Sequence, residues 1–274
     1  MTIIIGKSAN LSRALASSLE NVIMVSSLSP VLELKQLSLE KPINIIFNNF
    51  QKSTKLYDIS EPLNYIQRSI ISTVEVLEFL KKYNIRVNKI LYTSSSSVYG
   101  NNQLCTERDN LNPMNLPASL KVANEKLVEA FCQENKYEYT ICRLFNMYGG
   151  DDTFSIISKI IKYKDSKEIL TLYNHGSAIR DYIYINDVVK IYLQLLTISN
   201  IPIVNIGTSE GISVQSIITF LKKHNIYIQY DTIEKEEIEF STADTSLLKK
   251  YGLDIEYKNV QKYILESILK NEEE

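Results

Sequence analysis

The chain has 274 residues and a formal net charge of −2, with basic and acidic residues interspersed. This length suffices for one large α/β domain, or one domain with a smaller lobe, and the charge balance provides no broad positive field for nucleic acid or membranes. Cys105, Cys132 and Cys142 have unrelated spacings, which indicates neither a disulfide framework nor a zinc site. The opening run Met1–Gly6 lacks the features of a secretory signal, and no apolar run of about eighteen residues could span a membrane. We expect a cytoplasmic protein in a reducing compartment.

The chain opens with a predicted strand, a tight turn and a helix. A largely apolar run from Thr2 to Ile5 ends at Gly6, and Ser12 to Leu19 show helical spacing. A second strand is predicted over Asn21–Val25 and a third over Asn44–Phe47. The segment between these two strands is short, which predicts a reduced connection at this point of the fold.

An amphipathic helix is predicted between Glu61 and Tyr83. The apolar residues near one of its faces are Leu63, Ile66, Ile70, Val74, Leu77 and Leu80. A buried strand follows over Val87–Tyr92, and the serines of Thr93–Gly100 stand at its carboxyl end, where open α/β sheets place their ligands. The alternative interpretation of these serines is a polar turn after a core strand.

The rest of the chain alternates helices and strands. Elements are predicted at 121–133 (helix), 137–144 (strand), 154–163 (helix), 181–185 (strand), 187–196 (helix), 201–206 (strand), 214–223 (helix) and 260–269 (helix). This order predicts an α/β fold with a Rossmann-like, doubly wound parallel sheet over residues 1–150, to which residues 181–206 return. Residues 151–180 and 207–274 are expected to form a smaller C-terminal substrate-binding lobe.

Five motifs occur in an order that is more specific than any one of them alone. They are Thr93–Gly100, Pro117–Lys121, Arg143–Gly149, Gly176–Asp187 and Asn205–Ser213. Together they resemble the extended short-chain dehydrogenase/reductase family of sugar-nucleotide epimerases, dehydratases and reductases. The resemblance implies a dinucleotide cofactor, a nucleoside-diphosphate sugar as ligand, and a homodimer formed through the two long helices at 63–84 and 117–136.

The cofactor positions depart from the family pattern. The family's Gly-x-x-Gly-x-x-Gly maps onto Gly6, Ala9 and Ser12, so that only the first glycine remains. The side chains of Ala9 and Ser12, which replace the other two glycines, are small. We therefore expect dinucleotide binding to be weakened but possible. Ser26 stands after the second strand, where an acidic residue usually holds the ribose. These departures leave open whether the chain uses NAD, NADP or no dinucleotide.

The catalytic positions implied by the resemblance are Ser95 and Lys121. Lys121 is also a cofactor-binding position, because the family's lysine holds the cofactor ribose and lowers the pKa of a catalytic tyrosine. That tyrosine maps onto Pro117, which has no ionisable group and suits the first turn of a helix. Other tyrosines in the resembling motifs are Tyr99, Tyr148 and Tyr182, and the sequence does not select among them.

The substrate positions implied by the resemblance are Ser96, Asn146 and Arg180. Arg180 maps onto an arginine that binds the diphosphate, where a planar guanidinium suits two phosphate oxygens. The alternative is a structural ion pair with Asp181. Ser96 and Ser97 replace the acid and base that dehydratases use to eliminate water.

The leading functional hypothesis is therefore an NAD(P)-linked epimerase or 4-ketoreductase for a nucleoside-diphosphate sugar in surface-polysaccharide biosynthesis. A first alternative is a sugar-nucleotide isomerase or mutase of the same fold that uses no dinucleotide. A second alternative is a non-catalytic family member that binds a sugar nucleotide. Two isolated histidines, His175 and His224, indicate no metal site.

Overall fold

The computed structural model of the chain describes residues 1–51, 53–164 and 168–273. The chain divides into two compact units. Unit 1 comprises Met1–Val98, Leu111–Leu144 and Val189–Val204, and unit 2 comprises Tyr99–Asn110, Phe145–Val188 and Asn205–Glu274. Both units are mixed α/β structures, so the predicted fold class is confirmed.

Unit 1 is built on a six-stranded sheet with the order β10-β6-β4-β3-β1-β2. Its strands are β1 (Thr2–Ile5), β2 (Val22–Val25), β3 (Ile43–Phe47), β4 (Val87–Ser95), β6 (Tyr139–Leu144) and β10 (Ile203–Ile206). The pairs β1–β2, β1–β3, β3–β4 and β4–β6 are all parallel. Every residue of β1 is buried, as expected for a central strand whose sheet is covered on both faces.

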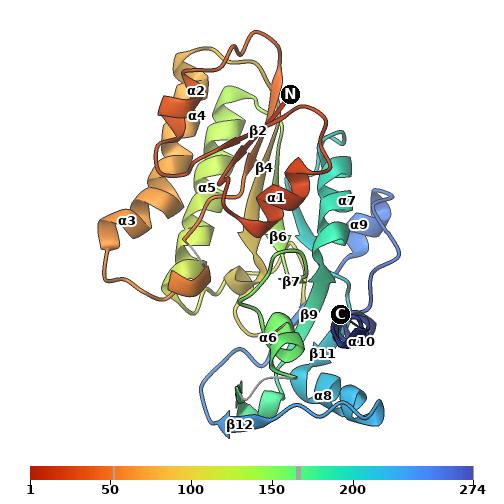
Figure 1. Ribbon diagram of the computed structural model, residues 1–274. Helices are drawn as coiled ribbons and strands as arrows, with labels where there is room; N and C mark the ends of the chain where they lie inside the picture. The colour runs from red at the N-terminus through yellow and green to blue at the C-terminus, as the bar shows by residue number, and fades with distance from the viewer. Residues whose placement is uncertain (52, 165–167, 274) are drawn as a thin grey trace. The chain divides into compact units, whose positions relative to one another are not determined.

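Helices cover both faces of this sheet. They are α1 (Asn10–Ala16), α2 (Pro30–Leu34), α3 (Pro62–Ile66), α4 (Ser72–Lys82), α5 (Leu116–Asn135) and α7 (Ile185–Leu195), with the 3-10 turns η1 (Ser53–Lys55) and η3 (Ser96–Tyr99). Figure 1 shows α2, α4 and α5 on one face and α1 on the other. Only the five-residue α2 lies between β2 and β3, which agrees with the short connection expected there.

The long helix predicted between Glu61 and Tyr83 is interrupted by a π-helical turn, η2, at Gln67–Ile71. The expected apolar face is therefore only half right. Leu77 and Leu80 are buried, whereas Leu63 is 76% exposed. A π turn adds one residue to the helix, which rotates the preceding residues by about 100° relative to those that follow.

Two buried asparagine side chains bond the backbone of this π turn. The amide of Asn49, just after β3, donates to the backbone carbonyl of Arg68 at 3.2 Å and to Ser72 Oγ at 2.6 Å. The amide of Asn124 on α5 donates to the carbonyl of Ser69. Because a π turn leaves carbonyl groups without their usual helical partners, these amides explain how the turn is maintained in a buried position.

Unit 2 holds two sheets. The larger has the order β11 (Gly211–Ser213), β9 (Ile179–Tyr184), β13 (Phe240–Ala243) and β5 (Asn102–Cys105), and β7 (Asn146–Tyr148) also pairs with β9. The smaller pairs β8 (Leu170–Tyr173) with β12 (Tyr230–Ile233). The helices are α6 (Ile156–Tyr163), α8 (Val214–Lys223), α9 (Ser246–Lys250) and α10 (Val260–Glu273), with the 3-10 turn η4 (Asn174–Gly176).

The unit boundaries differ from the expected domain boundaries of 1–150 and 181–206. Tyr99–Asn110 and Phe145–Val188 belong to unit 2. The reason is strand pairing, because β5 pairs with β13, and β9 pairs with β7, β11 and β13. Of the segment 181–206, Val189–Val204 lies in unit 1, and the residues on either side of it belong to unit 2.

Cys105, Cys132 and Cys142 are buried and carry thiols rather than disulfides. Burial raises the pKa of Cys132 and of Cys142 to about 12. Across residues 1–51, 53–164 and 168–273, no helix is long and apolar enough to cross a membrane.

Candidate functional site

The turn after β1 retains the conformation that requires glycine. Gly6 has a φ of +108°, and a Cβ added there would lie 2.5 Å from the carbonyl oxygen of Asn48. Ala9 precedes the first residue of α1, and its backbone N–H donates to the carbonyl of Gly6 at 3.1 Å. The chain therefore passes from strand to helix through a tight turn whose first position tolerates no side chain.

Ser12 occupies the predicted third glycine position and is fully buried. Its Oγ donates to the carbonyl of Gly6 at 2.8 Å and accepts from Asn48 Nδ2 at 2.9 Å. The buried hydroxyl is thus hydrogen-bonded on both sides, and the helix packs against the strand with the serine in place.

A carboxylate lies at the carboxyl end of β2, although the sequence shows only serines there. Glu33 on α2 accepts from the backbone N–H of Ser26 at 3.3 Å and pairs with Lys7 Nζ at 3.1 Å. Sequence reasoning missed Glu33 because it reaches back from the following helix. The sequence signal that could have identified Glu33 is an acidic residue in the first helix after the strand.

The residues of unit 1 fit a dinucleotide. The Gly6 turn leaves no room for a Cβ, Ser12 is accommodated, and Glu33 supplies the carboxylate that a ribose hydroxyl can bond. Glu33 is partly exposed and therefore accessible to a ligand, with a side-chain exposure of 35%.

Lys121 lies on α5 and is 9% exposed. Its Nζ donates to the backbone carbonyl of Thr93 at 2.7 Å, and it lies 4.4 Å from the ring centre of Phe50 and 5.1 Å from that of Tyr92. Burial lowers the pKa of Lys121 to about 7, against the attraction of Glu125, which raises it. Lys121 is therefore a buried lysine of α5 and not a solvated surface side chain.

Pro117 lies in the first turn of α5, as expected from its sequence position. The helix begins after Asn115, whose side-chain oxygen accepts from the backbone N–H of Ala118 at 3.0 Å. Pro117 is buried. The proline therefore serves the start of the helix and supplies no acid or base.

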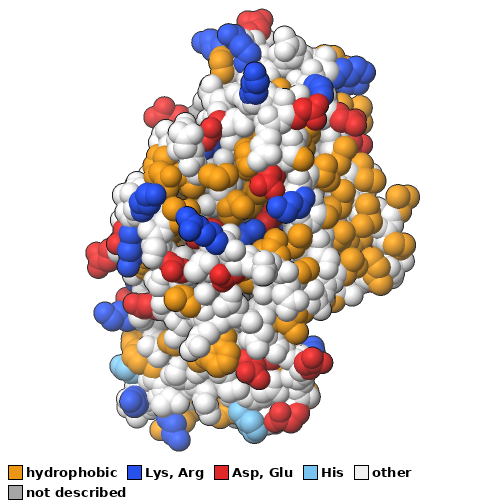
Figure 2. All heavy atoms as spheres, turned by 180° about the vertical axis from the view of Figure 1, so that it is seen from behind, with side chains coloured by type: hydrophobic (Ala, Val, Ile, Leu, Met, Phe, Trp, Pro, Cys, Tyr) orange, Lys and Arg blue, Asp and Glu red, His pale blue; other side chains and the backbone are white. Residues whose placement is uncertain are grey.

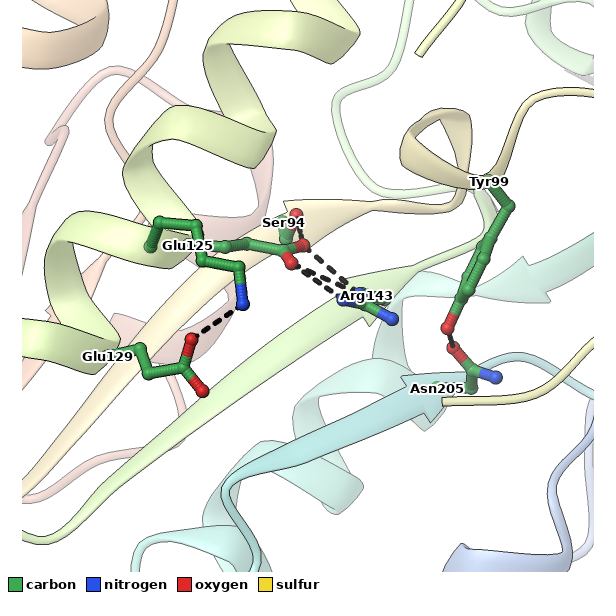
Figure 3. Close-up of polar contacts among 7 residues, drawn as sticks. Ser94, Tyr99, Glu125, Glu129, Arg143 and Asn205 are labelled. Atoms are coloured by element: carbon green, nitrogen blue, oxygen red, sulfur yellow. Dashed lines mark hydrogen bonds and ion pairs between the residues drawn. The ribbon is translucent and has the colours of Figure 1, made fainter. Parts of the chain in front are cut away.

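The serine segment divides into hydroxyls with different partners. Ser94 donates to the buried carboxylate of Glu125, which also pairs with Arg143 at 2.7 Å (Figure 3). Ser95 Oγ accepts from the N–H of Ser97 at 3.2 Å and from Ser97 Oγ at 2.9 Å. Because Ser95 accepts both bonds, its own proton remains to be donated elsewhere. Ser96 is buried in η3.

Two of the three alternative tyrosines donate their hydroxyls to protein groups within unit 2. Tyr99 donates to Asn205 Oδ1 at 2.6 Å (Figure 3), and Tyr148 donates to the carbonyl of Lys258 at 2.6 Å. Burial raises the pKa of Tyr182 to about 12. Burial also raises the pKa of Tyr148, so neither Tyr148 nor Tyr182 has the lowered pKa that a tyrosine base needs at neutral pH.

Unit 2 contains a cavity of about 640 Å³ that brings Asn146 and Arg180 together. Its remaining walls include the aromatic residues Phe154, Tyr163, Tyr173 and Tyr182, and the charged residues Lys159 and Glu237. Asn146 is positioned by a bond from its amide to the carbonyl of Asp181 at 3.3 Å. The cavity thus combines ring faces, an amide and cationic side chains.

Arg180 pairs with Glu237 at 3.0 Å and not with the neighbouring Asp181. Asp181 is fully buried and accepts from the backbone N–H groups of Thr208, Ser209 and Ala243. The structural ion pair considered for Arg180 and Asp181 is therefore wrong. Sequence reasoning missed Glu237, which lies 57 residues from Arg180 on a separate loop.

The loop that carries Glu237 is fixed by Asn174 in η4. The side chain of Asn174 accepts from the backbone N–H of Lys235 at 2.8 Å and donates to its carbonyl at 2.6 Å. It also donates to Glu237 Oε1 at 3.2 Å. Among the described residues, no group of three His, Cys, Asp or Glu side chains could hold a metal ion.

The sequence is similar to a known enzyme family and to several of its members. A model of the NAD dependent epimerase/dehydratase family matches residues 9–207. The chain is 28% identical to Protein CapI of Staphylococcus aureus over 169 residues, which covers 60% of this chain and 50% of that protein. It is 26% identical to a putative UDP-glucose 4-epimerase of Methanocaldococcus jannaschii over 200 residues, which covers 70% and 64%. The chain thus spans less than two thirds of the length of these curated relatives.

Solved structures share the fold. The UDP-glucose 4-epimerase of Thermotoga maritima with UDP-glucose superposes with a TM-score of 0.85 at 22% identity and full coverage of both chains. The UDP-glucuronic acid 4-epimerase of Bacillus cereus, in complex with UDP-glucuronic acid and NAD, gives 0.81 at 18% identity and covers 98% of this chain and 99% of that one.

Proposed function

The chain belongs to the NAD dependent epimerase/dehydratase family, and from this premise we propose that it is an NAD(P)-linked epimerase or 4-ketoreductase acting on a nucleoside-diphosphate sugar. The placement of the reaction in surface-polysaccharide biosynthesis rests on the sequence resemblance alone.

The observation that carries the proposal is the cavity of unit 2. Its volume of about 640 Å³ lies within the range of about 300–1,000 Å³ typical of small-molecule sites. The guanidinium of Arg180 is suited to phosphate oxygens, and the aromatic walls are suited to a base or a sugar ring. Asn146 adds an amide that can bond hydroxyl or carbonyl groups.

The residues of unit 1 are proposed to hold the dinucleotide. Gly6 and Ala9 would face its phosphates, and Ser12 would hold the turn from its buried position at the junction of helix and strand. Ser26 and Glu33 would bind its adenosine ribose, and Lys121 its other ribose. When bound, NAD or NADP supplies the acceptor and donor of hydride. Ser95 would donate its remaining proton to the reacting sugar oxygen.

The polar groups of η3 favour epimerase or ketoreductase chemistry over dehydration. Eliminating water requires an acid and a base at the positions of Ser96 and Ser97, and neutral hydroxyls supply neither at physiological pH. Ser96, buried in η3, is proposed as a substrate contact.

Pro117 favours a second candidate function. Because no phenol stands at this position, the chain could bind a sugar nucleotide without hydride transfer, either as an isomerase or mutase that uses no dinucleotide or as a non-catalytic partner. This candidate retains the ligand of the cavity and dispenses with the dinucleotide.

The test is thermal unfolding with uridine, thymidine, guanosine and cytidine diphosphate sugars. A true ligand should stabilise the fold by roughly 2.7 kcal/mol at a hundredfold excess over its dissociation constant. Arg180→Ala should largely remove this effect, whereas Arg108→Ala, an exposed arginine of the same unit outside the cavity wall, should retain it. Unchanged melting with all four classes would refute the proposal. Calorimetric titration with NAD and NADP separates the two candidates.

A further inference from the structure

Lys159 brings a second cation to the cavity of unit 2. It lies on α6 at helical spacing from Ile156 and Tyr163, and all three side chains line the cavity. Its Nζ lies 5.4 Å from the ring centre of Phe154, another residue of the cavity wall. The lysine is half-buried. The cavity therefore holds an ammonium in addition to the guanidinium of Arg180.

Lys159 carries a positive charge that no described carboxylate neutralises. Across residues 1–51, 53–164 and 168–273, its Nζ forms no ion pair and donates no hydrogen bond to a protein oxygen. Lys162, another lysine of α6, pairs with Glu168 at 3.1 Å. The ring of Phe154 attracts the ammonium but leaves its positive charge uncompensated. An ammonium has three N–H donors, and those of Lys159 remain available to a ligand.

Arg180 on β9 differs, because the protein already uses most of its donors. Its Nη2 bonds the carboxylate of Glu237 at 3.0 Å, and its Nη1 donates to the carbonyls of Ile179 at 3.0 Å and Glu239 at 3.4 Å. A guanidinium has five N–H groups, so these bonds leave donors for a single anionic group. The carboxylate of Glu237 also compensates the charge of Arg180. Among the described residues of the cavity wall, the uncompensated positive charge is therefore that of Lys159.

The half-buried position of Lys159 favours an anion as its partner. A charge that loses hydration without gaining an opposite charge is unfavourable, and a phosphate of a ligand supplies that opposite charge. The attraction is also stronger than at an open surface, since the effective dielectric constant is lower than in bulk water. Lysine binds phosphate oxygens as a compact point charge. Lys159 thus has the charge, the donors and the position for a phosphate contact.

A nucleoside diphosphate carries two phosphates, and two cations of the described cavity wall face it. We propose that Lys159 binds one phosphate of a nucleoside diphosphate while Arg180 binds the other. The cavity then prefers a diphosphate to the monophosphate of the same nucleoside, and Lys159 sets this preference. Both contacts lie within unit 2. This inference rests on the proposed function, in which Lys159 has no role.

The first test is calorimetric titration with the mono- and diphosphates of uridine, thymidine, guanosine and cytidine. Lys159→Met keeps the apolar stem of the side chain and removes the charge. It should weaken binding of the diphosphate by about five- to thirtyfold, as expected for loss of one charge-assisted contact. Binding of the monophosphate should weaken by less than about twofold, because the contact with Arg180 remains. Equal weakening of both ligands, or of neither, overturns the inference.

Two further variants serve as controls. Lys159→Arg restores a cation and should keep the affinity for the diphosphate within about threefold of the wild type. Lys162→Met removes an exposed lysine of the same helix that lies outside the cavity wall, and it should bind both ligands as the wild type does. If Lys162→Met loses as much affinity for the diphosphate as Lys159→Met, the effect comes from the helix and the inference is refuted.

The second test is the salt dependence of binding, which can be measured on the wild type without a variant. Raising the ionic strength should weaken binding of the diphosphate more steeply than binding of the monophosphate, because two charged contacts are screened instead of one. In Lys159→Gln, a second neutral variant, the two salt dependences should become more alike. A wild-type preference for the diphosphate that is independent of salt contradicts the inference.

The outcomes separate the role of Lys159 from the function on which it rests. A wild type that binds no nucleoside diphosphate and no nucleoside-diphosphate sugar refutes the proposed function and the role of Lys159 with it. Wild-type binding that is unchanged in Lys159→Met refutes only the role of Lys159. A loss seen with UDP-glucuronic acid but not with UDP-glucose or uridine diphosphate places a sugar carboxylate on Lys159 and overturns the phosphate contact.

Discussion

The guanidinium of Arg180 lies 3.0 Å from the carboxylate of Glu237, and both side chains line the cavity of unit 2. Arg180 also donates from Nη1 to the carbonyl of Ile179 at 3.0 Å, which fixes the orientation of its planar group. A phosphate that binds Arg180 must therefore share the guanidinium with Glu237 or displace that carboxylate.

Glu237→Gln should tighten the binding of a nucleoside-diphosphate sugar by about two- to fivefold. The reason is loss of a competing negative charge, and a partly exposed ion pair is worth about 1 kcal/mol or less. Glutamine keeps the oxygen that accepts from Asn174. The test compares the calorimetric dissociation constants of the wild type and Glu237→Gln. Glu236→Gln, on the same loop, is the control. Weaker binding in Glu237→Gln would mean that the carboxylate contacts the ligand.

Ala9→Gly should strengthen dinucleotide binding, whereas Ser12→Gly should lower the stability of the fold. Ala9→Gly removes a methyl group near the expected phosphate position and should tighten NAD or NADP binding. Ser12→Gly removes the hydroxyl that bonds Gly6 and Asn48, and should cost about 1 kcal/mol of stability. Calorimetry and urea denaturation measure the two effects. Equal tightening by both substitutions would contradict this assignment.

Ser95→Ala should lower turnover by about ten- to a thousandfold while leaving sugar-nucleotide affinity nearly unchanged. The expected reason is loss of a hydrogen bond that strengthens in the transition state. Ser119→Ala, an exposed hydroxyl of α5 that bonds the carbonyl of Asn115, is the control. If Ser95→Ala keeps full turnover, the serines of this segment are only a turn.

Lys121 should make the stability of the fold depend on pH. Its pKa is about 7 in the folded chain and near 10.5 when unfolded, so the unfolded state binds more protons between these values. Stability should therefore rise with pH through this window, by up to about 1.4 kcal/mol per pH unit. Urea denaturation from pH 7 to pH 9 should show a shallower rise for Lys121→Met than for the wild type or Lys126→Met, which removes an exposed lysine of the same helix. Parallel curves for all three proteins would exclude a shifted Lys121.

The outward face of α3 and of the segment that precedes it, from Tyr57 to Leu63, is proposed to form part of a homodimer interface. Hydrophobic side chains gather over α3 and α4 at the right of Figure 2, and Tyr57, Ile59 and Leu63 are 74%, 49% and 76% exposed. Leu63→Glu should shift a dimer to monomer in light scattering after size exclusion, because it buries a charge in an apolar contact. Leu32→Glu, an exposed leucine of α2, should leave the mass unchanged. An unaltered mass of Leu63→Glu together with a dimeric wild type would place the interface elsewhere.

Local signals were enough to predict many elements. The bounds predicted for α8, Val214–Lys223, agree with the structure, because Ser213 caps the helix and apolar residues recur at helical spacing. The strand Thr2–Ile5 and the turn at Gly6 were likewise predictable from neighbouring residues alone.

The π turn of η2 was not predictable in this way, since Asn49 and Asn124, which bond its carbonyls, lie 19 and 55 residues from their partners. The helical phase predicted before the turn was wrong for the same reason, whereas Leu77 and Leu80 after the turn are buried as expected. Glu33 and Glu237 were missed because each meets its cationic partner across 26 and 57 residues of chain. Asn146 and Arg180 were found through an ordered motif, but their shared cavity required the fold.

Alkylation of the three buried cysteines can report local unfolding of the chain. Cys132 and Cys142 belong to unit 1 and Cys105 to unit 2, so alkylation at each site measures how often the surrounding structure opens. Cys132 and Cys142 each have a pKa of about 12 and carry little thiolate at neutral pH, which makes their reaction from the closed state slow. Mass spectrometry of the labelled peptides would thus give separate opening rates for the two units. A ligand that occupies the cavity of unit 2 should slow labelling at Cys105 more than at Cys132 or Cys142.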